Sequence, residues 1–173
     1  MFDRVALDEL FDYTEYTWAV FGNAVRALPP GDFTRAVPGS GWPSLRDALF
    51  HIAGAWDEWL VEQTGAGLPI EQAEAYATWD ALDAQRTALR GLFRQLLDRP
   101  DDVLAEQIPI WDGRATQSRG EVLAHLLVHD LRHHGDITTL LFALGAEPPQ
   151  SDYGVYRFFK SRRQDGRKRL GDA

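Results

Sequence analysis

The chain has 173 residues, 45% hydrophobic and 25% charged, which suits one globular domain with a core and is short for two. It has no run of about eighteen apolar residues and no basic, apolar start, so we expect a cytoplasmic protein that neither crosses nor binds a membrane. The sequence contains no cysteine, which excludes disulfides, zinc–thiolate sites and a cysteine nucleophile.

The first two of four long helical patterns are separated by a loop rich in proline and glycine. The first pattern covers residues 3–28. The second begins after Ser44, a favourable N-cap with Asp47 three positions on, and is expected to end near Gly65. A loop around residues 67–69 follows.

The third helix is expected from its cap Thr78 to Leu97. Residues 103–117 differ in pattern and contain Asp112-Gly113, a dipeptide typical of two-residue hairpin turns. We therefore predict a short hairpin or an extended loop between the third and fourth helices.

The fourth helix begins at a capping box formed by Ser118 and Glu121 and ends at Gly145, a favourable residue after a helix C-terminus. Four long helices with one long connection predict an all-α fold, a four-helix bundle. We expect this domain to cover residues 1–156 and a basic tail to cover residues 157–173.

Charge is unevenly distributed along the chain, whose net charge is −8. Residues 157–173 carry seven basic and two acidic side chains, a net +5, which leaves −13 on the remainder. An acidic body repels phosphate backbones, so only the tail is suited to nucleic acid. We expect no nucleic-acid partner and predict that the tail is a solvated, partly frayed end.

Histidines of the fourth helix gather on one side of it. At about 100° per residue, His133 and His125 lie roughly 40° to either side of His129, and Asp136 lies about 20° from it. The apolar residues Val122, Leu126, Leu140 and Leu144 lie at similar angles, so we predict that the polar groups occupy the middle of the core-facing stripe. His134 points elsewhere.

Two of these histidines are spaced to bind one metal ion. His129 and His133 are one turn apart, whereas His125 and His133 are about 12 Å apart along the axis, too far for a shared ion. A third ligand must come from another helix, and His51, at the edge of the apolar arc of the second helix, is the remaining histidine. Solvent-facing or hydrogen-bonded core histidines are the alternative.

The segments 129–137 and 44–60 resemble parts of one known family. His129-Asp130-Leu131-Arg132-His133-His134-Gly135-Asp136-Ile137 resembles the H-x3-H-R-G-Q signature of the DinB/YfiT-like metalloenzymes, and residues 44–60 are similar to that family's second helix, which carries its first metal histidine. The loop 145–149, followed by Asp152-Tyr153, resembles the family's ending.

The resemblance implies a four-helix bundle that holds a metal ion through His51, His129 and His133. We expect one divalent transition-metal ion, zinc or nickel first, with iron or manganese as alternatives. Many members are dimers, so a homodimer is expected. Some relatives are thiol-dependent transferases or isomerases, in which the metal activates a low-molecular-weight thiol such as bacillithiol or mycothiol.

The chain departs from the signature at two positions. His134 replaces the usual arginine, and Asp136 replaces the usual glutamine. Asp136 is either an acceptor that orients an imidazole or a fourth ligand, which would close the site and argue against catalysis.

Glu58 is a candidate general base, with a solvated helix glutamate as the alternative. His125, one turn before His129, is a candidate bridge to bound water.

Five tryptophans are predicted to lie mostly in the core, with one or two lining a pocket near the metal: Trp18, Trp56, Trp59, Trp79 and Trp111. Our leading hypothesis is a metal-dependent transferase or hydrolase that acts on a small molecule, with any thiol supplied by a cosubstrate. The alternatives are a non-catalytic metal-binding stress-response protein and a helical interaction module that uses the basic tail.

Overall fold

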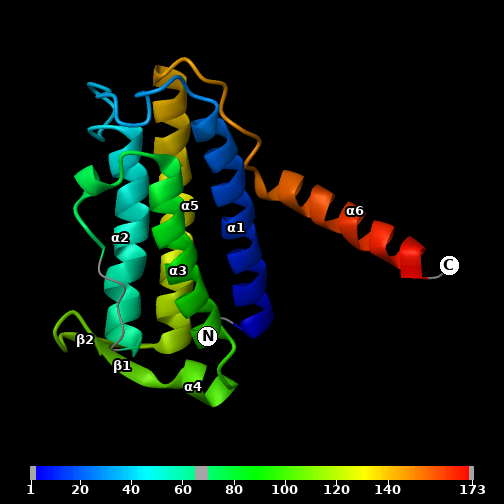
Figure 1. Cartoon of the computed structure of the whole chain (residues 1–173). Coiled ribbons are helices and arrows are strands. Elements are labelled where there is room, and N and C mark those ends of the chain that lie inside the picture. Colours follow the sequence, from blue (N-terminus) through cyan, green and yellow to red (C-terminus); the bar gives the residue numbers. More distant parts are fainter. Residues whose placement is uncertain (1–2, 65–69, 172–173) are drawn as a thin grey trace.

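The computed structural model describes residues 3–64 and 70–171, with side chains through residues 61 and 162 in these two ranges. Its long helices α1, α2, α3 and α5 lie side by side (Figure 1). Helix α2 packs against α5 and α3, and α1 packs against the same two helices. The bounds of these helices are Arg4–Arg26 for α1, Leu45–Thr64 for α2, Trp79–Leu97 for α3 and Arg119–Ala143 for α5.

Side-chain caps confirm the predicted helix starts. The Asp47 backbone N–H donates to Ser44 Oγ at 3.3 Å at the start of α2. Thr78 accepts from the backbone of α3, and Ser118 and Glu121 form the expected capping box at α5. The chain is therefore mostly helical, as predicted, and the loop expected at residues 67–69 lies outside the described residues.

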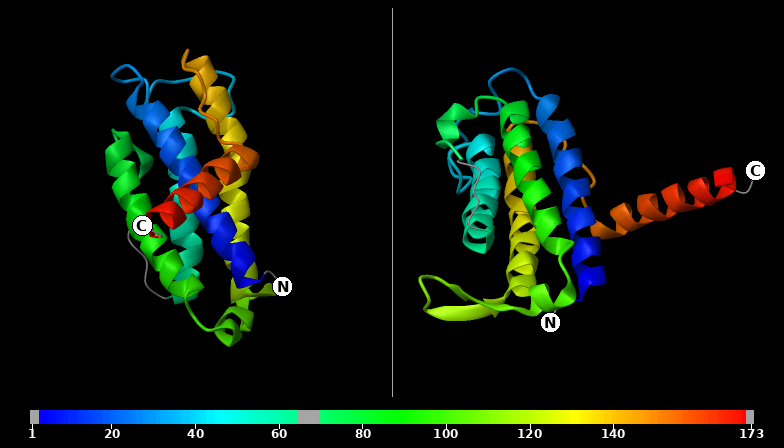
Figure 2. Two further views of the ribbon diagram at one scale, coloured as in Figure 1. Left: turned by 90° about the vertical axis from the view of Figure 1, so that its right-hand side faces the viewer. Right: turned by 60° about the horizontal axis from the view of Figure 1, so that its bottom comes forward.

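The segment before α5 contains a hairpin, but its loop is longer than predicted. Strands β1 (Gln107–Ile110) and β2 (Ala115–Ser118) are antiparallel, and Ile110 pairs with Ala115, so the loop has four residues rather than two. Trp111, Asp112 and Gly113 all have positive φ angles of 52°, 55° and 79°. Three consecutive left-handed residues require a wider loop than a two-residue turn. Figure 2 shows this hairpin at one end of the helices.

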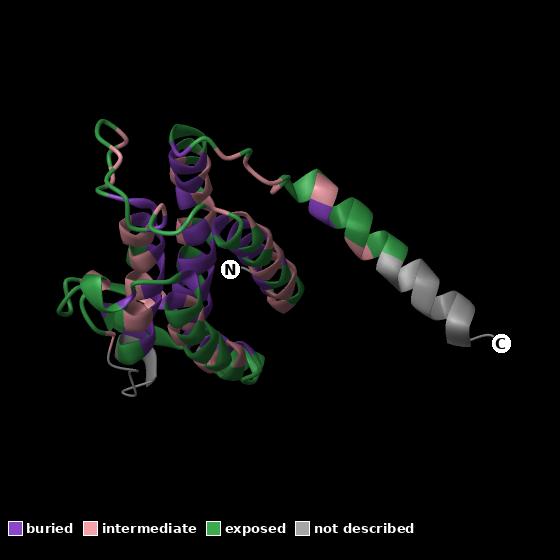
Figure 3. Ribbon diagram, turned by 45° about the horizontal axis from the view of Figure 1, so that its top comes forward, coloured by how far each residue is buried: buried purple, intermediate pink, exposed green. Residues whose placement is uncertain are grey.

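Short helical segments occur in two of the connections: η1 (Ala73–Ala75) between α2 and α3, and α4 (Asp101–Ala105) between α3 and β1. Buried residues line the facing sides of the long helices (Figure 3). Within the described ranges, no helix combines the length and the apolar character needed to cross a membrane.

The basic C-terminal segment, expected to be a solvated tail, belongs to a helix. Helix α6 (Tyr153–Gly171) runs across the boundary expected between residues 156 and 157 and projects away from the other helices (Figures 1 and 2). Arg157 and Lys160 each bond Glu9 of α1 at 2.8 Å. The acidic face of α1 therefore anchors the first turns of α6; the basic side chains of residues 163–169 lie outside the described ones.

A buried polar network joins all the long helices. Arg86 of α3, whose side chain is 1% exposed, pairs with Asp130 of α5 and with Glu15 of α1, each at 3.2 Å. The Trp56 indole of α2 donates to Asp130 at 2.6 Å. The Cζ atom of the Arg86 guanidinium lies 3.8 Å from the centroid of the Trp56 ring. Buried charges are tolerated only when they are paired in this way, so the network restricts how the helices pack.

The network predicts a large difference between two arginines one turn apart on α3. Arg86→Met leaves Asp130 buried without its cation and should lower the free energy of unfolding by about 3–5 kcal/mol. Arg90 also pairs with Glu15, at 2.7 Å, but its side chain is 49% exposed, so Arg90→Met should cost less than about 1 kcal/mol. Urea denaturation of both variants measures this, and equal losses would contradict the assigned role of the network.

Candidate metal site

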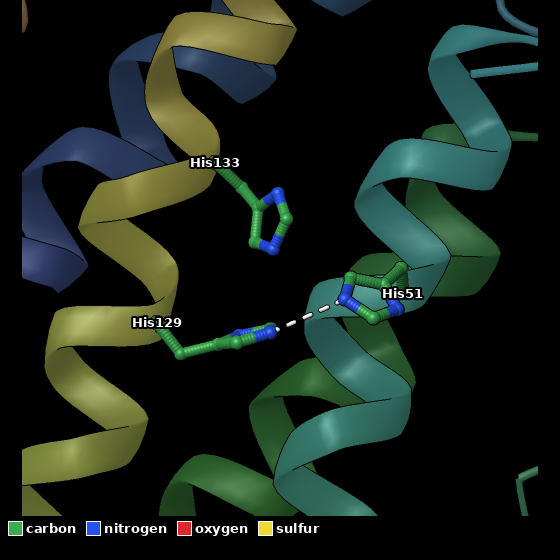
Figure 4. Close-up of side chains that lie close together, drawn as sticks. All are labelled: His51, His129 and His133. Carbon is green, nitrogen blue, oxygen red and sulfur yellow. Dashed lines mark hydrogen bonds between the residues drawn. The ribbon is translucent and has the colours of Figure 1, made fainter. Parts of the chain in front are cut away.

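Three histidines from two helices converge on one point. His51 of α2 faces His129 and His133 of α5 (Figure 4), and one ring nitrogen of each lies within 4.8 Å of the other two. The Nε2 atoms of His51 and His129 are 3.2 Å apart. Two nitrogen ligands at 2.0–2.1 Å from a tetrahedral ion are themselves roughly 3.3 Å apart. The cluster therefore has the donor atoms and the spacing to hold a metal ion.

The contact between His51 and His129 also has the length of a hydrogen bond, in which one ring donates to the other. Binding of an ion requires both Nε2 atoms to be unprotonated, which moves each ring proton to Nδ1. The Nδ1 atom of His129 is buried and has no hydrogen-bond partner among the described residues. Hydrogen bonding therefore leaves the tautomer of His129 free to adapt to an ion.

Asp136 orients His133. The Nδ1 atom of His133 donates to Asp136 Oδ2 at 2.7 Å, so in the neutral ring the Nε2 atom is the one with a free lone pair. Burial raises the pKa of Asp136, but hydrogen bonds from His133 and Trp42 outweigh burial and hold this pKa below its usual range. The carboxylate bonds the far side of the ring and is not part of the three-histidine cluster. Of the two predicted roles, the structure favours the orienting one.

Two of the three imidazoles, those of His51 and His129, are held in their neutral form. Burial, followed by the proximity of His133 and His51, lowers the pKa of His129 to about 4. Burial and then His133 also lower the pKa of His51. Both rings therefore carry a free lone pair at neutral pH, the form that binds a cation.

Trp42 was not identified from the sequence as part of the site. Its ring lies 5.0 Å from that of His51 and 5.6 Å from that of His133, between centroids, and its indole bonds Asp136. A large aromatic residue in a loop of glycine and proline, two residues before the cap Ser44, was the available signal. Trp42 thus contacts two members of the cluster and the group that orients one of them.

The predicted phase of α5 was wrong. Its most buried face is centred on Asp130, about 100° from His129, so the histidines lie at the edge of the buried face and not in its middle. His134, predicted to point elsewhere, packs against Phe21 of α1, with 5.3 Å between ring centroids. Because α5 contacts α1, α2 and α3, its buried face is wider than a single stripe.

The remaining candidates lie around the cluster. His125 is exposed and packs against Trp59 with 4.9 Å between ring centroids, outside the cluster, as its distance along the helix predicted. Of the five tryptophans predicted to be mostly core, Trp18, Trp56 and Trp79 are buried, whereas Trp111 is 57% exposed on the hairpin loop.

An open cavity of about 480 Å³ lies beside the cluster, here called the His51 cavity. Its lining includes His51 itself, Trp42, Phe50 and Glu58, so the predicted candidate base lies in the same cavity as one of the three histidines. A small organic molecule fits a space of this size. The cluster and the cavity together define a candidate site for a metal ion and a small ligand.

The chain combines a mostly helical architecture with a cluster of three histidines that has the spacing of a metal site. A comparison with family models matches the DinB family over residues 1–167, and the chain belongs to that family. This confirms the family that the 129–137 motif resembled. A search of curated proteins found no match to the chain.

The lowered pKa of His129 predicts a pH dependence of the metal-free protein. Because this pKa is about 4 in the folded chain and about 6.5 in the unfolded chain, the unfolded chain binds more protons between these values. Stability should therefore fall as the pH is lowered from about 6.5 to 4. Denaturation midpoints measured in EDTA across this range should show a shallower slope for His129→Asn, and an unchanged slope would contradict the shift.

The bond between Asp136 and His133 predicts a graded effect on metal affinity. Asp136→Asn removes the charged acceptor but keeps the side-chain shape, so it should weaken binding of Zn²⁺ or Ni²⁺ by about 10- to 100-fold without abolishing it. Competition with a chromogenic chelator measures the affinity. Abolished binding would instead indicate that Asp136 is a ligand.

Proposed function

We propose that the protein is a metal-dependent enzyme that transfers a small thiol to an electrophilic substrate. In this proposal His51, His129 and His133 hold one divalent ion, zinc or nickel first, with iron or manganese as alternatives. The packing of α1, α2, α3 and α5 is assigned to the DinB/YfiT-like four-helix bundle, and the active form is a homodimer. The observation that carries the proposal is the convergence of three imidazoles beside an open cavity.

Three protein ligands leave coordination positions for a substrate, as in catalytic metal sites. A bound divalent ion lowers the pKa of a coordinating thiol or water. Because the chain has no cysteine, the thiol comes from a cosubstrate. The thiol releases its proton to water, its sulfur forms a bond to an electrophilic carbon, and the leaving group departs with the electron pair of the broken bond.

In this proposal the side chains around the cluster hold and orient the three histidines. Asp136 holds His133 with its Nε2 atom available, and Trp42 packs against both His51 and His133. The alternative, a non-catalytic metal-binding protein, required Asp136 to close the site as a fourth ligand. Its bond to Nδ1 on the far side of the His133 ring supports the enzyme instead.

The proposal predicts close to one ion per chain in protein purified without an affinity tag. His129→Ala should reduce this to below about 0.1, because two imidazoles hold a divalent ion weakly. His125→Ala is the matched control, since His125 lies one turn away on the same helix and outside the cluster, and it should retain the ion. Less than about 0.1 ion per chain in the unmodified protein, unchanged by His129→Ala, would overturn the metal site.

The thiol step is tested separately. In Co²⁺-loaded protein, a thiol that binds the ion should produce a sulfur-to-cobalt charge-transfer band in the near ultraviolet, and His129→Ala should abolish it. Turnover is then sought by screening electrophiles with several thiols. A loaded protein that gives no such band with any thiol, but does bind water exchangeably, would favour hydrolysis over thiol transfer.

A further inference from the structure

The His51 cavity is lined by acidic but not by basic side chains. Carboxylates from two regions of the chain contribute to it: Asp47 and Glu58 from α2, and Glu71 from the segment before η1. Among the described residues that line it, none is lysine or arginine. A concave surface lined by carboxylates has a negative potential, which favours a cationic ligand.

Two of these carboxylates have no cationic partner among the described residues. Asp47 accepts from Ser44 at 2.5 Å and pairs with Arg46 at 3.1 Å, so its charge is compensated. Glu58 and Glu71 are exposed, and neither forms an ion pair with another described residue. These two charges are therefore available to a ligand in the cavity.

Aromatic groups in the cavity point to the same class of ligand. Trp42 and Phe50 line it together with the carboxylates. The faces of aromatic rings attract organic cations, and the indole of tryptophan does so most strongly. Carboxylates with aromatic rings suit an ammonium group and disfavour a carboxylate or a phosphate.

His51 connects the cavity to the metal site, because it belongs both to the three-histidine cluster and to the cavity lining. A short thiol whose sulfur binds the ion would therefore extend into the space between Trp42 and Glu58. Arg132 of α5 is the nearby cation that influences His51, lowering its pKa together with burial and His133, but it does not line the cavity.

We propose that the His51 cavity selects a thiol cosubstrate that carries a positively charged ammonium group, and that Glu58 and Glu71 are the specificity-determining residues. This inference rests on the proposed thiol-transfer function and names its substrate class. A thiol that carries several carboxylates is disfavoured by the same charges.

The test uses full-length Co²⁺-loaded protein and three thiols of similar length. Thiocholine has a permanent charge and cannot chelate the ion through nitrogen, 3,3-dimethylbutane-1-thiol is its neutral isostere, and 3-mercaptopropionate is anionic. Titration of the charge-transfer band should give the tightest binding for thiocholine and the weakest for 3-mercaptopropionate. The preference for thiocholine over its isostere should fall by roughly threefold to tenfold in Glu58→Gln/Glu71→Gln.

The double variant is necessary because a cationic thiol is also more acidic, which favours its binding in any protein. The preference for thiocholine that persists in the double variant gives the contribution of thiol acidity. The part of the preference that is lost gives the contribution of the two carboxylates. Glu147→Gln is the control, since it removes an exposed glutamate that does not line the cavity, and it should leave the preference unchanged. An equal preference in all three proteins would overturn the inference but not the thiol-transfer proposal.

Choline, which has no thiol, separates the two proposals further. Titration calorimetry of the metal-loaded protein should detect choline binding that weakens in the double variant. If no thiol gives a charge-transfer band but choline binds in this manner, thiol transfer fails and the cation-selective cavity stands. If choline does not bind, or binds the double variant equally well, the cavity assignment is wrong.

Discussion

Arg86 and Asp130 form a buried ion pair between α3 and α5, and the rotation of α5 about its own axis depends on it. Burial raises the pKa of Asp130 to about 6, which the Arg86 charge and the Trp56 hydrogen bond oppose. A carboxylate in such surroundings must point at its partners, because an unpaired buried charge is strongly destabilising. His129 is the preceding residue, about 100° away, so the same constraint directs it towards α2.

The candidate metal site is built outward from this constraint. The rotation of α5 places His129 and His133 opposite His51, and Asp136 then fixes the orientation of His133 through a bond to its Nδ1 atom. Trp42 contacts both the histidine cluster and the group that orients it, because it packs on His51 and bonds Asp136. Stability and function are thereby connected, since the helix that carries two of the three histidines also carries the buried carboxylate.

One side of α2 serves both regions. His51 belongs to the histidine cluster, whose nitrogen donors suit a transition-metal ion, and it also lines the cavity. Glu58, about two turns further along the same side, contributes a carboxylate to this cavity with its aromatic walls, and Glu71 adds a second one from the loop that follows. A ligand that reaches both regions needs one group that binds a metal ion and another that is attracted by a negative potential. This restricts the class of ligand more than either region does alone.

Local interactions determined what the sequence by itself could predict. The caps at Ser44, Thr78 and Ser118 depend on neighbours three residues away, and the spacing of His129 and His133 depends only on helix geometry. The buried face of α5 and the meeting of His51 with α5 were decided by tertiary structure. They follow from packing between segments distant in the chain, because the contacts of α5 with three helices and the pairing of Asp130 with Arg86 have no local signature.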